Sequence, residues 1–149
     1  MNHDQPYPSE YLADILASVK TIAMVGASND PTKFSYGVLR VLHETGYKMC
    51  PVNPRLAGKT IRGLRVFGSL ADIDVPVDMV QVFRASSALR QVAREAIEIN
   101  ARVLWAQIGV RDDEAARMAE DAGLQVVMNR CPKIELFRPY WTPRLNQVV

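Results

Sequence analysis

The sequence predicts an α/β protein built on a doubly wound parallel sheet of about five strands, with helices on both faces. Two observations lead to this fold class. Short apolar runs, typical of strands buried on both faces, alternate along the chain with segments of helical periodicity, which favours parallel strands joined by right-handed crossovers. The chain has 149 residues, 48% hydrophobic and 23% charged, so we expect one domain over residues 1–149.

The first elements expected along the chain are a helix, a strand and a second helix. Residues 9–19 carry apolar side chains at helical spacing, and Ser9 is the expected N-cap. The apolar run 21–26 ends in glycine and is typical of a buried strand. Residues 35–46 again show an apolar helical face, and Gly46 stands at the position of a helix C-cap.

The rest of the chain repeats this alternation. Strands are expected over residues 47–53, 78–83, 102–109 and 124–129. Helices are expected over residues 86–101 and 111–123, with one helical turn over residues 69–73. Glycines, a proline and basic residues predict a loop after the second strand, with a short extended piece at residues 65–68.

The candidate functional segments are those that follow each expected strand. In a sheet of this kind, ligands bind in the crevice outside the carboxyl ends of the strands, where the strand order reverses. These segments read GASNDPTKFSY, NPRLAGKTIRG, FRASS, QIGVRDD and NRCPKIE. The first two carry the clearest chemical signals.

The loop after the first strand begins like a phosphate-binding turn. Gly26 is followed by Ala27 and Ser28 instead of a second spaced glycine, so the dinucleotide fingerprint fails after its first position. The small residues, with Lys33 and a helix N-cap expected at Ser35, could still hold a phosphate through backbone N–H groups and the helix dipole. An ordinary strand-to-helix turn is the alternative.

The loop after the second strand is basic. A fold that binds NAD usually has an acidic residue here for the ribose hydroxyls, but this chain has Asn53, Pro54 and Arg55, followed by Lys59 and Arg62. Such cations suit a phosphate on the ribose, as in NADP or coenzyme A (CoA). A solvated basic loop without a ligand is the alternative.

Other classes of function find little support in the sequence. Cys50 and Cys131 form no C-x-x-C pair, so zinc has no expected site, and no nucleophile turn or Ser/His/Asp arrangement is visible. His43 falls within an expected helix. The acidic residues 112–114 begin another helix, where capping explains them. We therefore expect neither a metal nor a catalytic residue.

Charge and hydropathy exclude further partners. The net charge of +2 is spread along the chain, without the dense basic block of a nucleic-acid binder. No apolar run approaches the roughly 18 residues of a spanning helix, and the polar residues 1–11 lack the apolar core of a secretory signal. We expect a cytoplasmic protein that binds a small molecule and interacts with neither nucleic acid nor membrane.

Several of these segments together resemble a known family. The motifs VGAS with SY downstream, PVNPR, SLADI, VDMVQVFR, VLWAQIGV and VVMNRCPKIE are similar to those of the small single-domain CoA-binding proteins of bacteria and archaea. They also resemble the CoA-binding domain of the succinyl-CoA synthetase alpha subunit, which has an N-P motif after its second strand and an N-C-P motif after its last. The similarity runs in order from about residue 12 to residue 137.

The resemblance implies a Rossmann-like fold with CoA in the crevice. The pyrophosphate would lie near Gly26, Ala27, Ser28 and Ser35, the adenosine and its 3′-phosphate near Asn53, Pro54 and Arg55, and the pantetheine arm along Phe83, Arg84 and Ile108. The candidate CoA-binding set is completed by Lys33, Tyr36, Gly109, Asn129 and Cys131. Lys133 stands where the synthetase domain has a glycine beside its N-C-P motif. That domain is followed by a ligase domain with a phosphorylated histidine, for which this sequence leaves little room after residue 133, so we do not expect ligase chemistry to carry over.

Cys131 has reactive potential at this edge of the sheet. It follows the last expected strand, and Arg130 and Lys133 are close enough in sequence to favour a thiolate. A buried structural cysteine is the alternative that we favour, because cysteine is among the most buried residue types. Cys50, inside an apolar strand, is interpreted as structural.

The function expected from these observations is binding of CoA or an acyl-CoA without catalysis, as a carrier, sensor or regulatory protein. An NADP-dependent enzyme on the same fold is one alternative. A module that has kept the fold and lost the ligand is the other. The acyl group, the pathway and the oligomeric state are not encoded in any pattern of the sequence.

Overall fold

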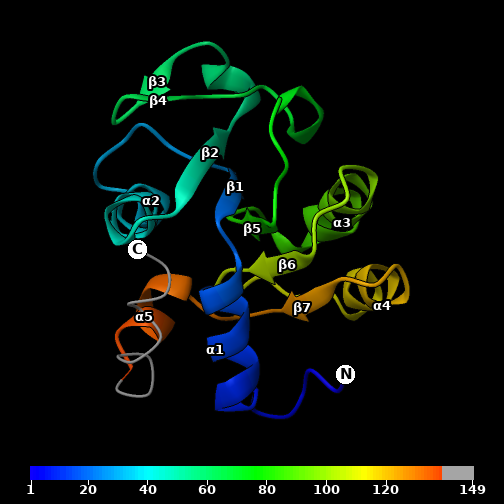
Figure 1. Ribbon diagram of the computed structural model, residues 1–149. Helices are drawn as coiled ribbons and strands as arrows, with labels where there is room; N and C mark the ends of the chain where they lie inside the picture. Colours follow the sequence, from blue (N-terminus) through cyan, green and yellow to red (C-terminus); the bar gives the residue numbers. More distant parts are fainter. Residues whose placement is uncertain (139–149) are drawn as a thin grey trace.

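A five-stranded parallel sheet organises the computed structural model, which describes residues 1–138 (Figure 1). The order of its strands is β2-β1-β5-β6-β7, and every neighbouring pair is parallel. The strands are β1 (Thr21–Val25), β2 (Lys48–Val52), β5 (Met79–Val82), β6 (Val103–Ala106) and β7 (Gln125–Val127). The Rossmann-like fold class expected from the sequence is confirmed.

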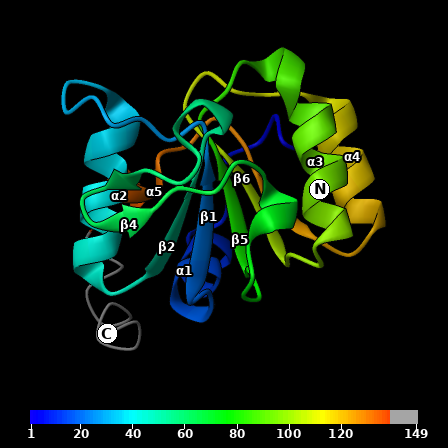
Figure 2. The ribbon, with the colours of Figure 1, turned by 90° about the horizontal axis from the view of Figure 1, so that it is seen from above.

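Helices cover both faces of this sheet. One face carries α1 (Ser9–Ser18), α2 (Phe34–Thr45) and α5 (Pro132–Leu136), and the other carries α3 (Leu89–Glu98) and α4 (Asp113–Asp121) (Figures 1 and 2). Three short 3-10 turns, η1 (Pro54–Leu56), η2 (Leu70–Asp72) and η3 (Ser86–Ala88), lie in the connections. The helical turn expected near residues 69–73 corresponds to η2.

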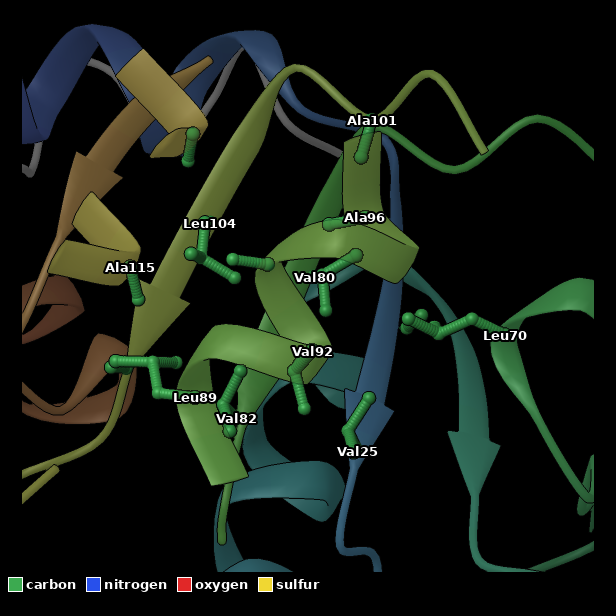
Figure 3. Close-up of a cluster of buried hydrophobic side chains, with 14 of the residues drawn as sticks. Val25, Leu70, Val80, Val82, Leu89, Val92, Ala96, Ala101, Leu104 and Ala115 are labelled. Atoms are coloured by element: carbon green, nitrogen blue, oxygen red, sulfur yellow. The ribbon is translucent and has the colours of Figure 1, made fainter. Parts of the chain in front are cut away.

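The strands are apolar on both sides because each side of the sheet packs against helices. Successive side chains of a strand point to opposite faces. Met24 and Trp105 therefore contribute to the core under α1, α2 and α5, while Val80, Val82 and Leu104 contribute to the core under α3 and α4. Figure 3 shows the second cluster between the sheet and α3. This double burial explains the continuous apolar runs of the sequence.

Two expected N-caps are wrong, whereas one C-cap is confirmed. The N-cap of α1 is Pro8 rather than Ser9, and that of α2 is Lys33 rather than Ser35. Ser35 is the second residue of α2 and is buried. Gly46 ends α2 in the left-handed region, with a φ of 119°. A serine near a helix start does not by itself fix the cap, because neighbouring residues with extended backbone can occupy that position.

The second half of the loop expected after β2 forms a small hairpin. The antiparallel strands β3 (Thr60–Ile61) and β4 (Leu64–Arg65) are joined by Arg62 and Gly63, both with positive φ, 51° and 80°. Paired positive φ values are typical of a tight hairpin turn, but arginine is an unusual residue for its first position, so the sequence signal was weak. The extended piece expected at residues 65–68 contributes a parallel bridge between Phe67 and Val52.

The outer edge of β7 is covered by two tyrosines at the start of α1. Tyr11 Oη donates to Val126 O (2.8 Å) and accepts from Val126 N (3.0 Å), and Tyr7 Oη accepts from Met128 N (2.8 Å). The two rings stack, with centroids 6.0 Å apart. His3 Nδ1 lies 2.7 Å from Tyr7 Oη. These contacts fix residues preceding α1 against the end of the sheet.

Candidate functional site: a cleft at the switch point of the sheet

A cleft lies at the carboxyl ends of β1, β2 and β5, where the strand order reverses. From β1 the chain passes to β2 on one side and then to β5 on the other, so β1 and β5 flank the switch point. The cleft has a volume of about 500 Å³. Its walls include Gly26, Asn53, Pro54, Arg55, Arg84 and Glu95. It therefore combines residues from the first three segments identified in the sequence.

Gly26, directly after β1, packs closely against the backbone at the end of β5. Its φ is +89°, and a β-carbon built on it would lie 2.3 Å from the carbonyl oxygen of Phe83. The N–H groups of Gly26 and Ala27 both donate to the carbonyl oxygen of Val52, at 3.1 and 3.3 Å. These two donors are therefore occupied, and any phosphate contact of this turn must come from residues further along the loop.

Asn53 connects the loops that surround the cleft. Its Nδ2 donates to the carbonyl oxygen of Ala27 (2.8 Å), and its Oδ1 accepts from the backbone N–H of Arg55 (2.9 Å). Its own N–H donates to Phe67 O (3.0 Å). The Asn-Pro pair begins η1, with Pro54 at a position where a helix needs no N–H donor. Asn53 thus fixes the backbone that carries Arg55.

Two arginines supply the positive charge of the cleft. Arg55 and Arg84 are both exposed, and neither forms an ion pair within residues 1–138. Glu95, on α3, adds one carboxylate, whose Oε1 accepts a hydrogen bond from Gln91 (3.3 Å). Two guanidinium groups and one carboxylate leave the cleft with a positive balance, which suits a phosphorylated ligand.

The other cations of the basic loop do not line the cleft. Arg62 Nη2 lies 3.6 Å from Glu44 Oε1, and its guanidinium lies over the ring of Tyr36, 5.9 Å from the centroid. Lys59 is exposed next to the hairpin and is not part of the cleft wall. Arg55 is therefore the cation of this loop with direct access to a ligand in the cleft.

The loop between β1 and α2 is shaped by its own polar side chains. Ser28 Oγ accepts from Asp30 N (3.0 Å), and Asp30 Oδ1 accepts from the N–H (2.9 Å) and the hydroxyl (2.8 Å) of Thr32. These bonds from Thr32 hold the pKa of Asp30 below its usual value. The first N–H groups of α2 follow, and such groups bind anions. Lys33, the exposed N-cap, adds a positive charge there.

The loops after β6 and β7 are tied together at the same edge of the sheet. Asn129 Oδ1 accepts from Gly109 N (2.8 Å), and Trp105 Nε1 donates to Arg130 O (2.9 Å). Asn129 and Gly109 both have positive φ, 59° and 84°. Ile108 lies in the sequence between β6 and Gly109, and its apolar side chain is 55% exposed to solvent.

Cys131 is buried and packs into the core beneath α2 and α5. It also lines a second cavity of about 190 Å³ between the starts of these helices, together with Lys33, Phe34 and Lys133. Its burial favours the structural interpretation, and a reactive thiolate stays a prediction. Cys50 is buried in β2, and this burial raises the pKa of its thiol.

The structure brings the candidate residues together only in part. Five of them line the cleft: Gly26, Asn53, Pro54, Arg55 and Arg84. Two line the smaller cavity: Lys33 and Cys131. The others lie in the loops or at the start of α2 and line neither space. Glu95 is a cleft residue that sequence reasoning missed, because a charged residue on an exposed helix face gives no signal of its own.

No catalytic constellation is apparent among the described residues. Within residues 1–138, no group of three or more His, Cys, Asp or Glu residues could hold a metal ion. The expected capping role of residues 112–114 is confirmed, because Asp112 is the N-cap of α4 and its Oδ1 accepts from Glu114 N (3.1 Å). His43 is exposed on α2. None of the helices in this part of the chain is long and apolar enough to cross a membrane.

The fold and the cleft define a class: parallel α/β domains with a cleft at the switch point of the sheet, which is where such sheets bind their ligands. Residues 20–136 match the family model of the CoA binding domain, and the chain belongs to this family. This assignment confirms the resemblance to CoA-binding proteins that was drawn from the sequence motifs.

Individual relatives agree with this assignment. The chain is 39% identical over 123 residues to YneT, an uncharacterised protein of Bacillus subtilis, covering 83% of this chain and 90% of that protein. It is 27% identical over 131 residues to the alpha subunit of an ADP-forming acetate–CoA ligase of Pyrococcus furiosus, covering 80% of this chain and 28% of that subunit. A solved structure from Thermus thermophilus has a TM-score of 0.82 at 36% identity, covering 93% of this chain and 99% of that one.

Proposed function

We propose that this protein binds CoA, or an acyl-CoA, at the carboxyl edge of its parallel sheet. The observation that carries the proposal is that Arg55 and Arg84, which form no ion pair within residues 1–138, both line a cleft of about 500 Å³ at the switch point. A guanidinium group recognises phosphate through charge-assisted hydrogen bonds. Membership of the CoA-binding domain family supports the same ligand.

The proposed orientation of CoA follows the distribution of charge along this edge. The adenosine and its 3′-phosphate occupy the cleft beside Arg55 and Arg84. The pyrophosphate lies toward the loop after β1, near Ser28, Lys33 and the first turn of α2. The pantetheine arm then follows the carboxyl edge past Ile108, whose apolar side chain is 55% exposed.

We propose a carrier, sensor or regulatory role rather than catalysis. The described residues offer a binding cleft without an adjacent acid/base pair or metal cluster. The acetate–CoA ligase subunit is an enzyme component, but this chain spans 28% of its length, so that activity is not assigned. The organisation of residues 1–149 as one CoA-binding domain also stays a prediction.

Titration calorimetry on ligand-free protein tests the proposed function. CoA, acetyl-CoA, NADP and NAD are titrated separately under the same conditions. We expect CoA or acetyl-CoA to bind more tightly than either dinucleotide. Tighter binding of NADP would favour the dinucleotide-enzyme alternative, since the same arginines could hold its 2′-phosphate. Absence of binding for all four would favour the module that has lost its ligand.

A further inference from the structure

A buried pair of glutamines lies beneath the carboxyl edge of the sheet. Gln81, in the central strand β5, is fully buried, and its Nε2 donates to Oε1 of Gln107 at 3.0 Å. In the sheet register, Gln81 is flanked by Met24 and Trp105, both of which belong to the core under α1, α2 and α5. The amide pair therefore interrupts an otherwise apolar layer.

Gln81 carries an unsatisfied polar atom. Among the side chains of residues 1–138, its Oε1 is the single buried nitrogen or oxygen atom without a hydrogen-bond partner. Burying an amide oxygen without a partner costs free energy, so a methionine or leucine would suit this position better for stability alone. Residues that break such a rule are expected at sites where function, rather than stability, selects them.

The hydrogen bond from Gln81 fixes the orientation of the Gln107 side chain. The backbone of Gln107 is held by two bonds, from its N–H to Val82 O (3.1 Å) and from Val110 N to its carbonyl oxygen (2.9 Å). Its side-chain oxygen is held by Gln81. The Nε2 group of Gln107 remains without a partner in the described part of the chain, directly before the exposed Ile108.

We propose that Gln107 donates a hydrogen bond to an amide carbonyl of the pantetheine arm, and that Gln81 is the residue that positions it. This assignment rests on the proposed function, because it concerns the same bound CoA. The arm contains two amides separated by apolar segments. A fixed amide donor beside an apolar side chain matches that alternation, and a neutral donor is suited to a neutral carbonyl.

The test compares CoA with adenosine 3′,5′-bisphosphate, which retains the 3′-phosphate and lacks the arm. The variants are Gln107→Met and Gln81→Met, each titrated with both ligands by calorimetry. We expect each variant to bind CoA about threefold to tenfold more weakly than the wild type and to bind the bisphosphate equally well. Gln125→Met is the matched control, because Gln125 is exposed at the amino end of β7 and should change neither affinity.

Thermal unfolding separates positioning from a structural role. Gln81→Met removes the unsatisfied oxygen of Gln81 but also the donor to Gln107 Oε1, so we expect the melting temperature to stay close to that of the wild type while CoA binding weakens. The double variant should bind CoA no more weakly than Gln107→Met alone, since Gln81 acts through Gln107.

The outcomes distinguish this inference from the proposed function. If the wild type binds CoA and Gln107→Met binds it equally well, the assignment of Gln107 is wrong while the proposed function stands. Equal weakening of CoA and the bisphosphate would also contradict a contact with the arm. If the wild type does not bind CoA, the proposed function itself is overturned, and this inference with it.

Discussion

Arg55 is expected to be the main determinant of affinity for the 3′-phosphate of CoA. It follows the Asn-Pro pair that fixes its backbone, and it lines the cleft without an ion-pair partner in the described residues. We predict that Arg55→Ala binds CoA about tenfold more weakly, because a charge-assisted hydrogen bond contributes roughly 1.5–3 kcal/mol. Calorimetry measures the change.

Dephospho-CoA and a neighbouring lysine provide the controls for that prediction. The wild type should prefer CoA to dephospho-CoA by a similar factor, and Arg55→Ala should show little preference. Lys59→Ala removes a charge of the same loop outside the cleft and should bind CoA nearly as well as the wild type. Equal affinity of the wild type for the two ligands would remove Arg55 from the proposed contact.

Gly26 is predicted to be required for the stability of the fold, independently of any ligand. A β-carbon there would lie 2.3 Å from Phe83 O, and its φ of +89° is strained for any other residue. We expect Gly26→Ala to lower the free energy of unfolding by at least about 2 kcal/mol, measured by urea denaturation. A substitution at this position therefore cannot report on phosphate binding alone.

Gly37 offers a matched control for the same substitution. It lies within α2, where an added β-carbon meets no atom within 4 Å. Gly37→Ala should raise the free energy of unfolding by about 0.5–1 kcal/mol, because alanine is the better helix former. Similar stability of the two variants would contradict the close packing of Gly26 against the end of β5.

At the scale of elements, helix α4 depends on Asp112. This residue is the N-cap of α4, and its Oδ2 accepts from Arg90 Nε on α3 at 2.7 Å. We predict that Asp112→Ala lowers the free energy of unfolding by about 1 kcal/mol at neutral pH, mainly through loss of the cap. Asp112→Asn should lose less, since asparagine is also a good N-cap.

The contribution of Asp112 is expected to depend on pH. The hydrogen bond from Arg90 is the main reason why the pKa of Asp112 lies below its usual value. Its charge-dependent stabilisation is therefore fully present above the unfolded pKa of about 3.9 and is lost as the pH falls through the lower folded pKa. Urea denaturation at pH 7 and at about pH 3 should show the difference between wild type and Asp112→Asn shrinking in acid. A difference that grows in acid would contradict this sign.

The order of the elements could be predicted from the sequence, whereas their ends and the small hairpin could not. Alternating apolar runs and helical periodicity are strong signals because both faces of the sheet are buried, and all five sheet strands lie within the expected ranges. The prediction of N-caps at Ser9 and Ser35 was wrong because a favourable residue type does not determine backbone conformation. The hairpin was missed because Arg62 occupies a position usually taken by asparagine, aspartate or glycine.

The cleft could be located from the sequence more readily than its full lining. The rule that ligands bind outside the carboxyl ends of parallel strands identified the loops of Gly26, Asn53 and Arg84. Glu95 comes from the side of a helix, and its approach to the cleft depends on how α3 packs against the sheet. The contact between Gln81 and Gln107 also depends on side-chain geometry, which the spacing of residues along one strand does not reveal.

At the scale of the whole molecule, Tyr7 and Tyr11 are predicted to protect the last strand of the sheet. Their hydroxyls bind the backbone of Val126 and Met128, and burial raises the pKa of Tyr11 to about 12. Replacing both tyrosines with phenylalanine should accelerate amide hydrogen exchange at Val126 and Met128. The loss of stability should be about 1–3 kcal/mol, from the three hydrogen bonds to the backbone of Val126 and Met128.

Tyr36→Phe is the control for the double tyrosine variant, because the hydroxyl of Tyr36 has no hydrogen-bond partner among residues 1–138. It should leave exchange at both amides unchanged. Unchanged exchange in the double variant, measured by mass spectrometry or NMR, would contradict the protection assigned to the two hydroxyls.

The covered edge of β7 limits the ways in which this protein can bind other proteins. At the opposite end of the sheet, Phe67 occupies part of the outer side of β2, donating its N–H to Pro51 O (2.9 Å) and accepting from Asn53 N (3.0 Å). An open strand edge is a template on which a foreign chain can add a further strand and begin aggregation. Because groups of the protein itself occupy part of both margins, we expect the sheet to resist the addition of a foreign strand at these positions.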